Sequence, residues 1–262
     1  MQDFLIIDDN LRTAMRFFGH ATGTGEITSL PGSVAIYSGL DYGVFNIAML
    51  DGPVTVSNES FATRLAALSR YFKERTPRWS LWLCEDLIEP SQRRRARQMI
   101  SEIGLRAISH LPGMTAGHLL PPVGTLPQLE VLPVVDHVLQ AAFGEITALA
   151  FDIPFEIAQA VYAQDRAWRG EYQGYVGLVN GRPAAIVATV VTSGAIGVYS
   201  LATDPSLRRR GYGEAVMRAA VDQVRERTGI DKVVLQSTEA GYPLYRRMGF
   251  RDATRFTVYL TK

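Results

Sequence analysis

The sequence of 262 residues contains one cysteine, Cys84, and only four histidines. A single cysteine excludes an internal disulfide and a cysteine-rich metal site. His20, His110, His118 and His137 lack the spacing of metal ligands, and no histidine lies near Cys84 in the sequence. We therefore predict no metal site and interpret Cys84 as a structural thiol.

An excess of charge of one sign and long hydrophobic runs are also missing. The 27 lysines and arginines against 26 acidic residues leave a net charge of +1. This balance offers no electrostatic footprint for nucleic acid or an anionic membrane. No apolar run reaches the roughly 18 residues that a membrane-spanning helix needs. Residues 1–9 lack the cationic segment of a signal peptide, so the expected location is cytoplasmic.

A proline-rich segment divides the chain into two parts of similar size. The stretch 118–127 contains three prolines and a glycine, which cannot continue a helix or a central strand. Since domains usually have about 100 to 200 residues, the length also fits two modest domains. We place the boundary near residue 124 and predict domains at 1–124 and 125–262.

The C-terminal half alternates strand-like and helix-like segments. Asn180-Gly181 between two β-rich runs is a strong hairpin signal. Strands separated by helices predict an α/β (α+β) fold, and the hairpin makes the sheet mixed. The predicted strands are 128–134, 172–179, 183–192, 195–202, 232–237 and 254–260, and the predicted helices are 135–151, 154–165, 211–228 and 239–248.

The N-terminal half repeats part of this order. Strands are predicted at 33–39, 43–50 and 79–85, and helices at 59–75 and 90–103. Gly104-Leu-Arg106 follows the last helix as Gly249-Phe-Arg251 does in the second half. Both halves thus run strand, long helix, strand, short helix, Gly-apolar-Arg, which predicts a degenerate tandem repeat.

The segment 201–214 carries the clearest chemical signal. It leaves a predicted strand, turns through a loop with Arg208, Arg209 and Arg210, and enters a helix at Gly211-Tyr-Gly213. The first N–H groups of a helix lack intrahelical partners, so with the helix dipole and the arginines they favour a phosphate. The alternative is a glycine-containing loop with a solvated basic face.

Two common nucleotide-binding motifs do not match this loop. A dinucleotide fingerprint would need a third glycine where Val216 stands. A nucleoside-triphosphate loop would need a lysine where Glu214 follows Gly213. Both of these ligands are therefore disfavoured.

The pattern Arg208-x-x-Gly211-x-Gly213 resembles the acetyl-CoA signature of the GNAT superfamily of N-acetyltransferases. Tyr245, four residues before Gly249-Phe250, resembles that family's second signature. The resemblance is specific over residues 128–262 and faint over 1–124. It implies two GNAT-like domains, each a mixed, mostly antiparallel twisted sheet flanked by helices, with a degenerate N-terminal domain that is structural or shapes the substrate site.

The resemblance also implies roles for individual residues. Tyr245 matches the general acid, and the backbone N–H of Leu201 matches the donor to the oxyanion. The residues it assigns to the cofactor are Leu201, Thr203, Arg208, Arg209, Arg210, Gly211, Tyr212, Gly213, Glu214 and Ser237. Strand 195–201 has no carboxylate to act as general base. A water wire remains an alternative, as does a carboxylate from elsewhere such as Glu145, Asp152 or Glu156, and none is chosen.

The expected function is transfer of an acetyl group from acetyl-CoA to a primary amine by direct attack, without a metal. The acceptor is expected to be a small-molecule or peptide amine rather than nucleic acid or a membrane, and a homodimer is left open. The alternative is a non-catalytic module that binds or senses acyl-CoA.

The equivalent loop of the N-terminal half, 50–58, has no arginine and contains Pro53, so it should bind CoA poorly.

Overall fold

The computed structural model describes residues 1–55 and 60–261. Its strands are β1 (Glu26–Leu30), β2 (Ser33–Tyr37), β3 (Ile47–Leu50), β4 (Ser80–Cys84), β5 (Leu105–Ala116), β6 (Glu130–Pro133), β7 (Gln173–Val179), β8 (Arg182–Thr192), β9 (Ala195–Thr203), β10 (Val233–Gln236) and β11 (Arg251–Thr261). Its helices are α1 (Asp3–Gly19), α2 (Phe61–Lys73), α3 (Arg93–Glu102), α4 (His137–Phe151), α5 (Phe155–Tyr162), α6 (Tyr212–Thr228) and α7 (Tyr242–Arg247).

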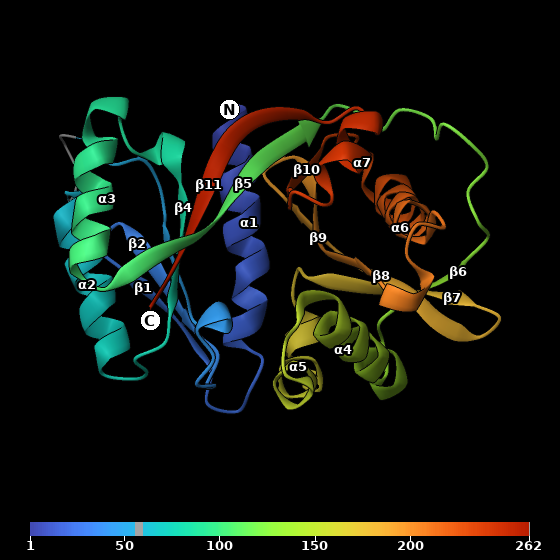
Figure 1. The fold of residues 1–262 in the computed structure, drawn as a ribbon, viewed down its shortest axis with the longest axis horizontal. Coiled ribbons are helices and arrows are strands. Elements are labelled where there is room, and N and C mark those ends of the chain that lie inside the picture. The colour runs from blue at the N-terminus through green and yellow to red at the C-terminus, as the bar shows by residue number, and fades with distance from the viewer. Residues whose placement is uncertain (56–59, 262) are drawn as a thin grey trace.

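The strands join in one sheet with the order β1-β2-β3-β4-β11-β5-β10-β9-β8-β7-β6. Only β3–β4 and β9–β10 pair in parallel, and the other neighbours are antiparallel. The predicted mixed, mostly antiparallel sheet with flanking helices is confirmed. Figure 1 shows two lobes, one around β1–β4 with α2 and α3, the other around β6–β10 with α4 to α7. Across the described ranges, no helix has the combined length and apolarity to cross a membrane.

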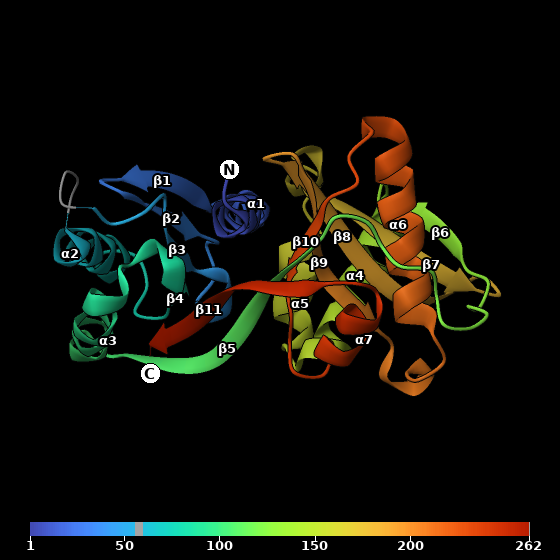
Figure 2. The same ribbon diagram turned by 90° about the horizontal axis from the view of Figure 1, so that it is seen from above.

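The long strands β5 and β11 span both lobes (Figures 1 and 2). In the N-terminal lobe β11 lies between β4 and β5, so that Val258 faces Trp82 on one side and Ser109 on the other. In the C-terminal lobe the end of β5 pairs with β10 over residues 113–116. Each lobe therefore completes its sheet with a strand from the other half of the chain, and the boundary predicted near residue 124 falls between β5 and β6.

Helix α1 lies between the lobes and was missed in the sequence analysis, as were β1 and β5. Its buried face includes Ile7, Leu11 and Phe18, spaced as one side of a helix. Asn10 on the same helix donates through Nδ2 to the carbonyl oxygens of β8 and β9, at 3.2 Å from Ala195 O. A Cβ on Gly197 would meet Asn10 Oδ1, so this glycine permits the close approach of α1 to β9.

The repeated order of elements is present in both halves. The series β3, α2, β4, α3, β5 in the first half corresponds to β9, α6, β10, α7, β11 in the second. Gly104 and Gly249, which precede β5 and β11, both have positive φ, at 87° and 95°. The hairpin predicted at Asn180-Gly181 is also present, with positive φ at both residues. The start predicted for α2, Glu59, lies outside the described residues.

Candidate functional site

Strands β9 and β10 separate at the centre of the C-terminal lobe. They pair in parallel over only three positions, from Ile196 to Val198 on β9. Beyond that point β10 pairs with β5 alone: Gln236 pairs with Gly113, and the Ser237 N–H donates to Pro112 O at 2.9 Å. A wedge therefore opens between the two strands towards their carboxyl ends.

A β-bulge in β9 lies beside this wedge. The register with β8 passes from Tyr199↔Ala188 to Ala202↔Ile186, so two residues on β9 face one on β8. Ser200 adopts φ 47°, and neither it nor Leu201 has a paired residue on β8 or β10. The bulge takes the Leu201 backbone out of the regular ladder at the position predicted for the oxyanion donor.

The loop that follows β9 presents backbone N–H groups. Arg209 and Gly211 adopt φ of 67° and 85°, and Gly211 precedes the first residue of α6. Among the described residues, no acceptor receives a hydrogen bond from the amides of residues 209–214, and Ala215 is the first to bond, to Gly211 O at 3.0 Å. Successive amides in left-handed and helical turns form a concave site for anions.

Two glycines bring this loop close to its surroundings. A Cβ on Gly213 would lie 3.1 Å from Thr203 Oγ1, so α6 begins directly beside the end of β9. A Cβ on Gly211 would lie 3.0 Å from Pro127 Cδ. Gly211 is thus favoured both by its positive φ and by its contact with the segment before β6.

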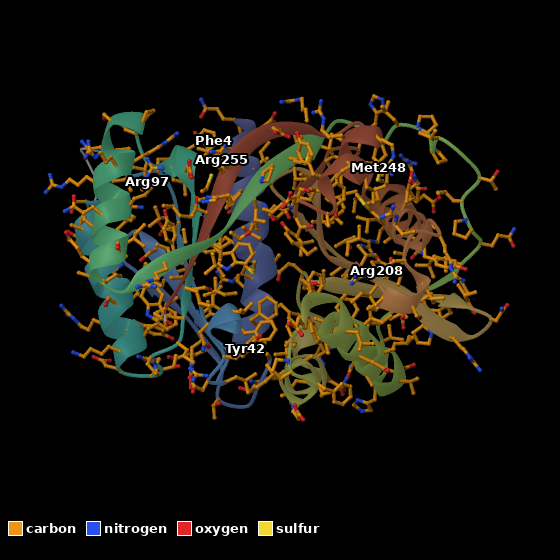
Figure 3. All side chains as sticks on the ribbon, in the orientation of Figure 1. Phe4, Tyr42, Arg97, Arg208, Met248 and Arg255 are labelled. Atoms are coloured by element: carbon orange, nitrogen blue, oxygen red, sulfur yellow. The ribbon has the colours of Figure 1, made fainter. Side chains whose placement is uncertain are left out.

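The side chains around the loop differ in their contacts. Glu214 accepts two hydrogen bonds from Arg218, at 2.9 and 2.7 Å, which leaves its amide available. Arg208 reaches Ala150 O at 3.4 Å and lies in the C-terminal lobe (Figure 3). Arg209 and Arg210 are exposed, and Tyr212 is half-buried. The loop therefore combines free amides with exposed positive charge.

A cavity of about 550 Å³ lies between the two lobes, and both Leu201 and Tyr245 line it. Tyr245 is 8% exposed, and its ring meets Phe250 edge-on at 5.7 Å. Burial raises the pKa of Tyr245 above its ordinary value, so the phenol remains protonated and able to donate. The structure thus brings the two predicted catalytic groups to one cavity.

Other predicted residues lie apart from this cavity. The buried Ser237 hydroxyl donates to Thr238 O at 2.8 Å. Glu145, Asp152 and Glu156 are exposed, and none of them lines the cavity. The carboxylates considered as general bases are therefore not placed where an acceptor amine would bind.

The cavity also contains tyrosines that the sequence analysis did not single out. Tyr172 Oη and Ser200 Oγ lie 2.7 Å apart, and Tyr199 Oη donates to Asn10 Oδ1 at 2.6 Å. The one available signal was local, because Tyr199 and Ser200 directly precede Leu201 in the strand. Tyr172, in contrast, reaches the cavity only through the tertiary fold.

Cys84 contributes to packing rather than to this site. Its side chain is fully buried on β4, and Sγ lies 3.3 Å from Thr254 Oγ1. Burial is the main cause that raises the pKa of Cys84 to about 12, so the thiol carries its proton at neutral pH.

Comparison with known proteins agrees with this geometry. Residues 136–250 match the sequence profile of the acetyltransferase (GNAT) family. A curated relative, the [ribosomal protein bS18]-alanine N-acetyltransferase of Escherichia coli K12, is 27% identical over 137 residues, which cover 50% of this chain and 84% of the relative.

Two solved structures resemble the whole chain. A GCN5-related N-acetyltransferase from Kribbella flavida matches with a TM-score of 0.72 at 18% identity, covering 100% of this chain and 96% of that one. A tandem GNAT protein from the clavulanic acid biosynthesis pathway matches with a TM-score of 0.57 at 13% identity, covering 97% and 95%. These likenesses support the two-lobed fold. The chain therefore carries an acyltransferase domain of the GNAT family at residues 136–250.

Proposed function

We propose that the C-terminal half, residues 125–262, transfers an acetyl group from acetyl-CoA to a primary amine. The observation that carries this proposal is that β9 connects a loop of unbonded amides to a cavity that both predicted catalytic residues line. Free amides of residues 209–214 lie at the end of β9, and Leu201 and Tyr245 line the cavity beside it. The E. coli relative is named for N-acetylation of an alanine, which supports an amine acceptor.

The residues present fit acetyl-CoA. The amides of Arg209 to Glu214 would hold the pyrophosphate, with the arginine side chains adding positive charge. Leu201 and Thr203 on β9 would lie along the pantetheine arm, which can occupy the space where β9 and β10 no longer pair. Ser237 would contribute from the β10 side through its backbone, because its hydroxyl already donates to Thr238 O.

The transfer step follows from the two groups at the cavity. The amine nitrogen attacks the thioester carbon, the C–S bond breaks, and an amide bond forms. The Leu201 N–H donates to the oxygen that gains negative charge, and one such donor contributes on the order of 3 kcal/mol. Tyr245 gives its proton to the departing thiolate, while the amine releases one proton to solvent, from which Tyr245 is reprotonated.

The N-terminal domain, residues 1–124, would shape the acceptor site. Met15 and Phe18 of α1, Tyr42 and Trp82 line the same cavity as Tyr245. Removing this lobe would therefore open one wall of the cavity, in addition to removing the strand that β10 pairs with.

Calorimetric titration with acetyl-CoA, with NADH and ATP as controls, tests the cofactor. Thiol release across a panel of amines then tests transfer.

Tyr245→Phe should lower kcat by about 10²- to 10⁴-fold with unchanged acetyl-CoA affinity. Tyr242→Phe is the matched control, because Tyr242 lies on the same short helix and donates to Asp252 at 3.2 Å without lining the cavity.

A non-catalytic acyl-CoA sensor is the second candidate. Among the described residues lining the cavity there is no carboxylate to act as a base, which favours this alternative. Selective CoA binding without thiol release on any amine would support the sensor. Absence of CoA binding would contradict both candidates.

A further inference from the structure

The cavity between the lobes is uncharged. None of its described lining residues is aspartate, glutamate, lysine, arginine or histidine. The burial of an unpaired charge is strongly unfavourable, so an ammonium group would have to enter without a counter-ion. The wall composition therefore opposes an acceptor that remains protonated in the bound state.

Aromatic rings form much of the wall on the N-terminal side. Phe18 and Phe45 are stacked, with ring centroids 4.8 Å apart, and Tyr42 and Trp82 line the cavity with them. Figure 3 shows Tyr42 at the junction of the two lobes. Flat rings of this kind favour a planar apolar group through stacking or edge contacts.

The polar atoms of the wall are neutral, and two of them can only donate. Trp82 Nε1 and Gln236 Nε2 are buried and have no hydrogen-bond partner among the described residues. An ammonium group also only donates, so it cannot satisfy either atom. A neutral amine, or an oxygen on the same molecule, can accept.

The tyrosines of the cavity do not supply an anion either. Burial raises the pKa of Tyr162 to about 12 and the pKa values of Tyr172 and Tyr199 well above the ordinary value. Their phenols remain neutral at physiological pH. No group in the wall can therefore balance an ammonium or take its proton.

We infer that the acceptor is an amine that is uncharged at neutral pH and is carried on an apolar body of ring size, as in an aromatic amine. This inference rests on the proposed function. A neutral nitrogen has its lone pair available without a general base, which accounts for the uncharged wall around Tyr245 and Leu201. It also enters the cavity without the penalty of burying a charge.

Two isomeric amines test the effect of charge on the acceptor while its size and ring stay nearly the same. The amine of para-ethylaniline is neutral at neutral pH, whereas para-methylbenzylamine has the same composition and carries an ammonium group. We expect kcat/KM for para-ethylaniline to be at least about tenfold higher, because only the benzylamine must lose its charge on entry. Equal or higher kcat/KM for para-methylbenzylamine would overturn the inference and indicate recognition of the cation by the rings.

Binding to the protein in complex with CoA gives a readout that does not depend on transfer. We expect para-ethylaniline to bind this complex at least about tenfold more tightly than its isomer. That preference without thiol release would contradict the transferase proposal while supporting the assignment of the cavity. Absence of binding by para-ethylaniline, or better activity with a diamine or a peptide N-terminus, would overturn the inference.

A substitution at the exposed edge of the cavity tests directly how a carboxylate in its wall changes the preference for a neutral amine. Ile108 lines the cavity and is 56% exposed, so Ile108→Glu adds a carboxylate without disturbing the core. We expect this variant to reduce the preference for para-ethylaniline by about tenfold. Leu149→Glu, at a 54% exposed position away from the cavity, should leave the preference unchanged. An equal effect of both variants would contradict the assignment.

Discussion

The two lobes repeat the same order of elements, but the loops after β3 and β9 present different backbone groups, carbonyl oxygens in the first and amides in the second. After β9, the amides of residues 209–214 have no acceptor in the described part of the chain. After β3, the parallel pairing with β4 covers only Ile47 and Ala48, and the Val54 N–H then donates to Leu87 O at 2.8 Å. The wedge of the N-terminal lobe is therefore bridged by its own backbone.

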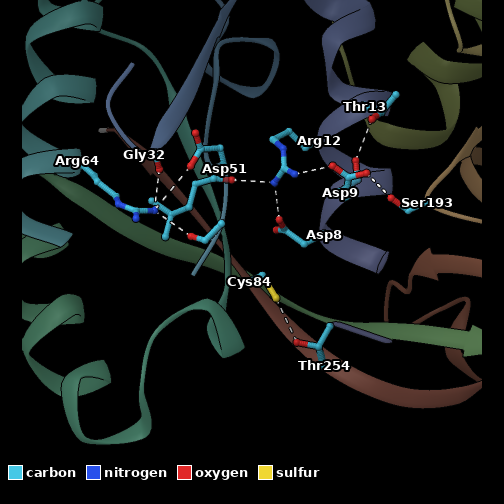
Figure 4. Close-up of polar contacts among 12 residues, drawn as sticks. Asp8, Asp9, Arg12, Thr13, Gly32, Asp51, Arg64, Cys84, Ser193 and Thr254 are labelled. Carbon is cyan, nitrogen blue, oxygen red and sulfur yellow. Dashed lines mark hydrogen bonds and ion pairs between the residues drawn. The ribbon is translucent and has the colours of Figure 1, made fainter. Parts of the chain in front are cut away.

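The buried side chain of Arg64 also distinguishes the N-terminal loop from the C-terminal one. Its side chain is 2% exposed, and it donates to Gly32 O, Gly52 O and Pro53 O at 2.8 to 3.1 Å (Figure 4). The N-terminal loop thus turns carbonyl oxygens towards an internal cation, whereas the C-terminal loop turns amides outward. We expect only the latter to bind pyrophosphate. Residues 56–58 of the loop predicted at 50–58 lie outside the described residues.

Separation of the lobes should have the largest effect. A fragment of residues 125–262 lacks β5, which pairs with β10 over residues 113–116, and it leaves β11 without either of its neighbours, β4 and β5. The free edge of β10, the unpaired β11 and the surface of β8 and β9 that α1 covers would be exposed to solvent. We therefore expect no cooperative thermal unfolding. Near-ultraviolet circular dichroism with temperature measures this.

The matched control for this fragment is the full chain cleaved within 117–129, with both pieces retained. The cleaved protein should keep its cooperative transition, because the segment contains neither helix nor strand. A fragment that melts cooperatively and binds acetyl-CoA like the full chain would show that the lobes are independent.

Gly211→Val should have the next largest effect, on acetyl-CoA affinity. Valine at φ 85° is strained, and its Cβ would approach Pro127 Cδ to 3.0 Å, so the loop must rearrange. Together these effects predict about a 1,000-fold rise in Kd. Gly104→Val is the control in the other lobe, with φ 87° and no atom within 4 Å. Comparable loss of affinity in both variants would attribute the effect to general strain.

Most helices and strands of the C-terminal half were predictable because their signals are local. The glycine and arginine spacing at 208–213 and the Asn180-Gly181 turn each depend on neighbouring residues. Helix α1 was not recognised, because its buried face includes the polar residues Asp8 and Asn10. Asn10 is satisfied by carbonyl oxygens about 180 residues further along the chain, which no local pattern reveals.

The same distinction holds for the site. The loop and Tyr245 were found from motifs, whereas the cavity wall combines α1, Tyr42, Trp82 and Tyr172 through tertiary packing. The insertion of β11 between β4 and β5 is likewise a pairing between distant segments. Hydrophobic periodicity identifies strands but does not specify which strands become neighbours.

Arg64→Met should lower stability without changing cofactor affinity. The substitution leaves buried carbonyl oxygens without their donor, and we expect the free energy of unfolding to fall by about 3 kcal/mol. Urea denaturation measures this, with titration of acetyl-CoA beside it. Arg70→Met is the control, because Arg70 is exposed on the same helix. Weaker acetyl-CoA binding by folded Arg64→Met would mean that the N-terminal loop contributes to the cofactor site.

The smallest predicted effect concerns two adjacent carboxylates on α1 that face different lobes. Asp9 accepts a hydrogen bond from Ser193 of the C-terminal lobe at 2.5 Å (Figure 4). Asp8 is buried on the N-terminal side beside Arg12, at 2.6 Å, and Arg12 also donates to Leu50 O. Burial outweighs the attraction of Arg12 and raises the pKa of Asp8 to about 7.

Because the folded-state pKa of Asp8 lies above its unfolded value, the folded protein binds a proton that the unfolded chain has already released. The stabilisation is present at acidic pH and is lost as pH rises through about 7. The free energy of unfolding should therefore fall by about 2 kcal/mol from about pH 5 to about pH 8, and Asp8→Asn should abolish this slope. Urea titrations at both pH values measure it, with Asp9→Asn as the control that keeps the slope. A slope that persists in Asp8→Asn would assign the pH dependence to other groups and remove the distinction between the two carboxylates.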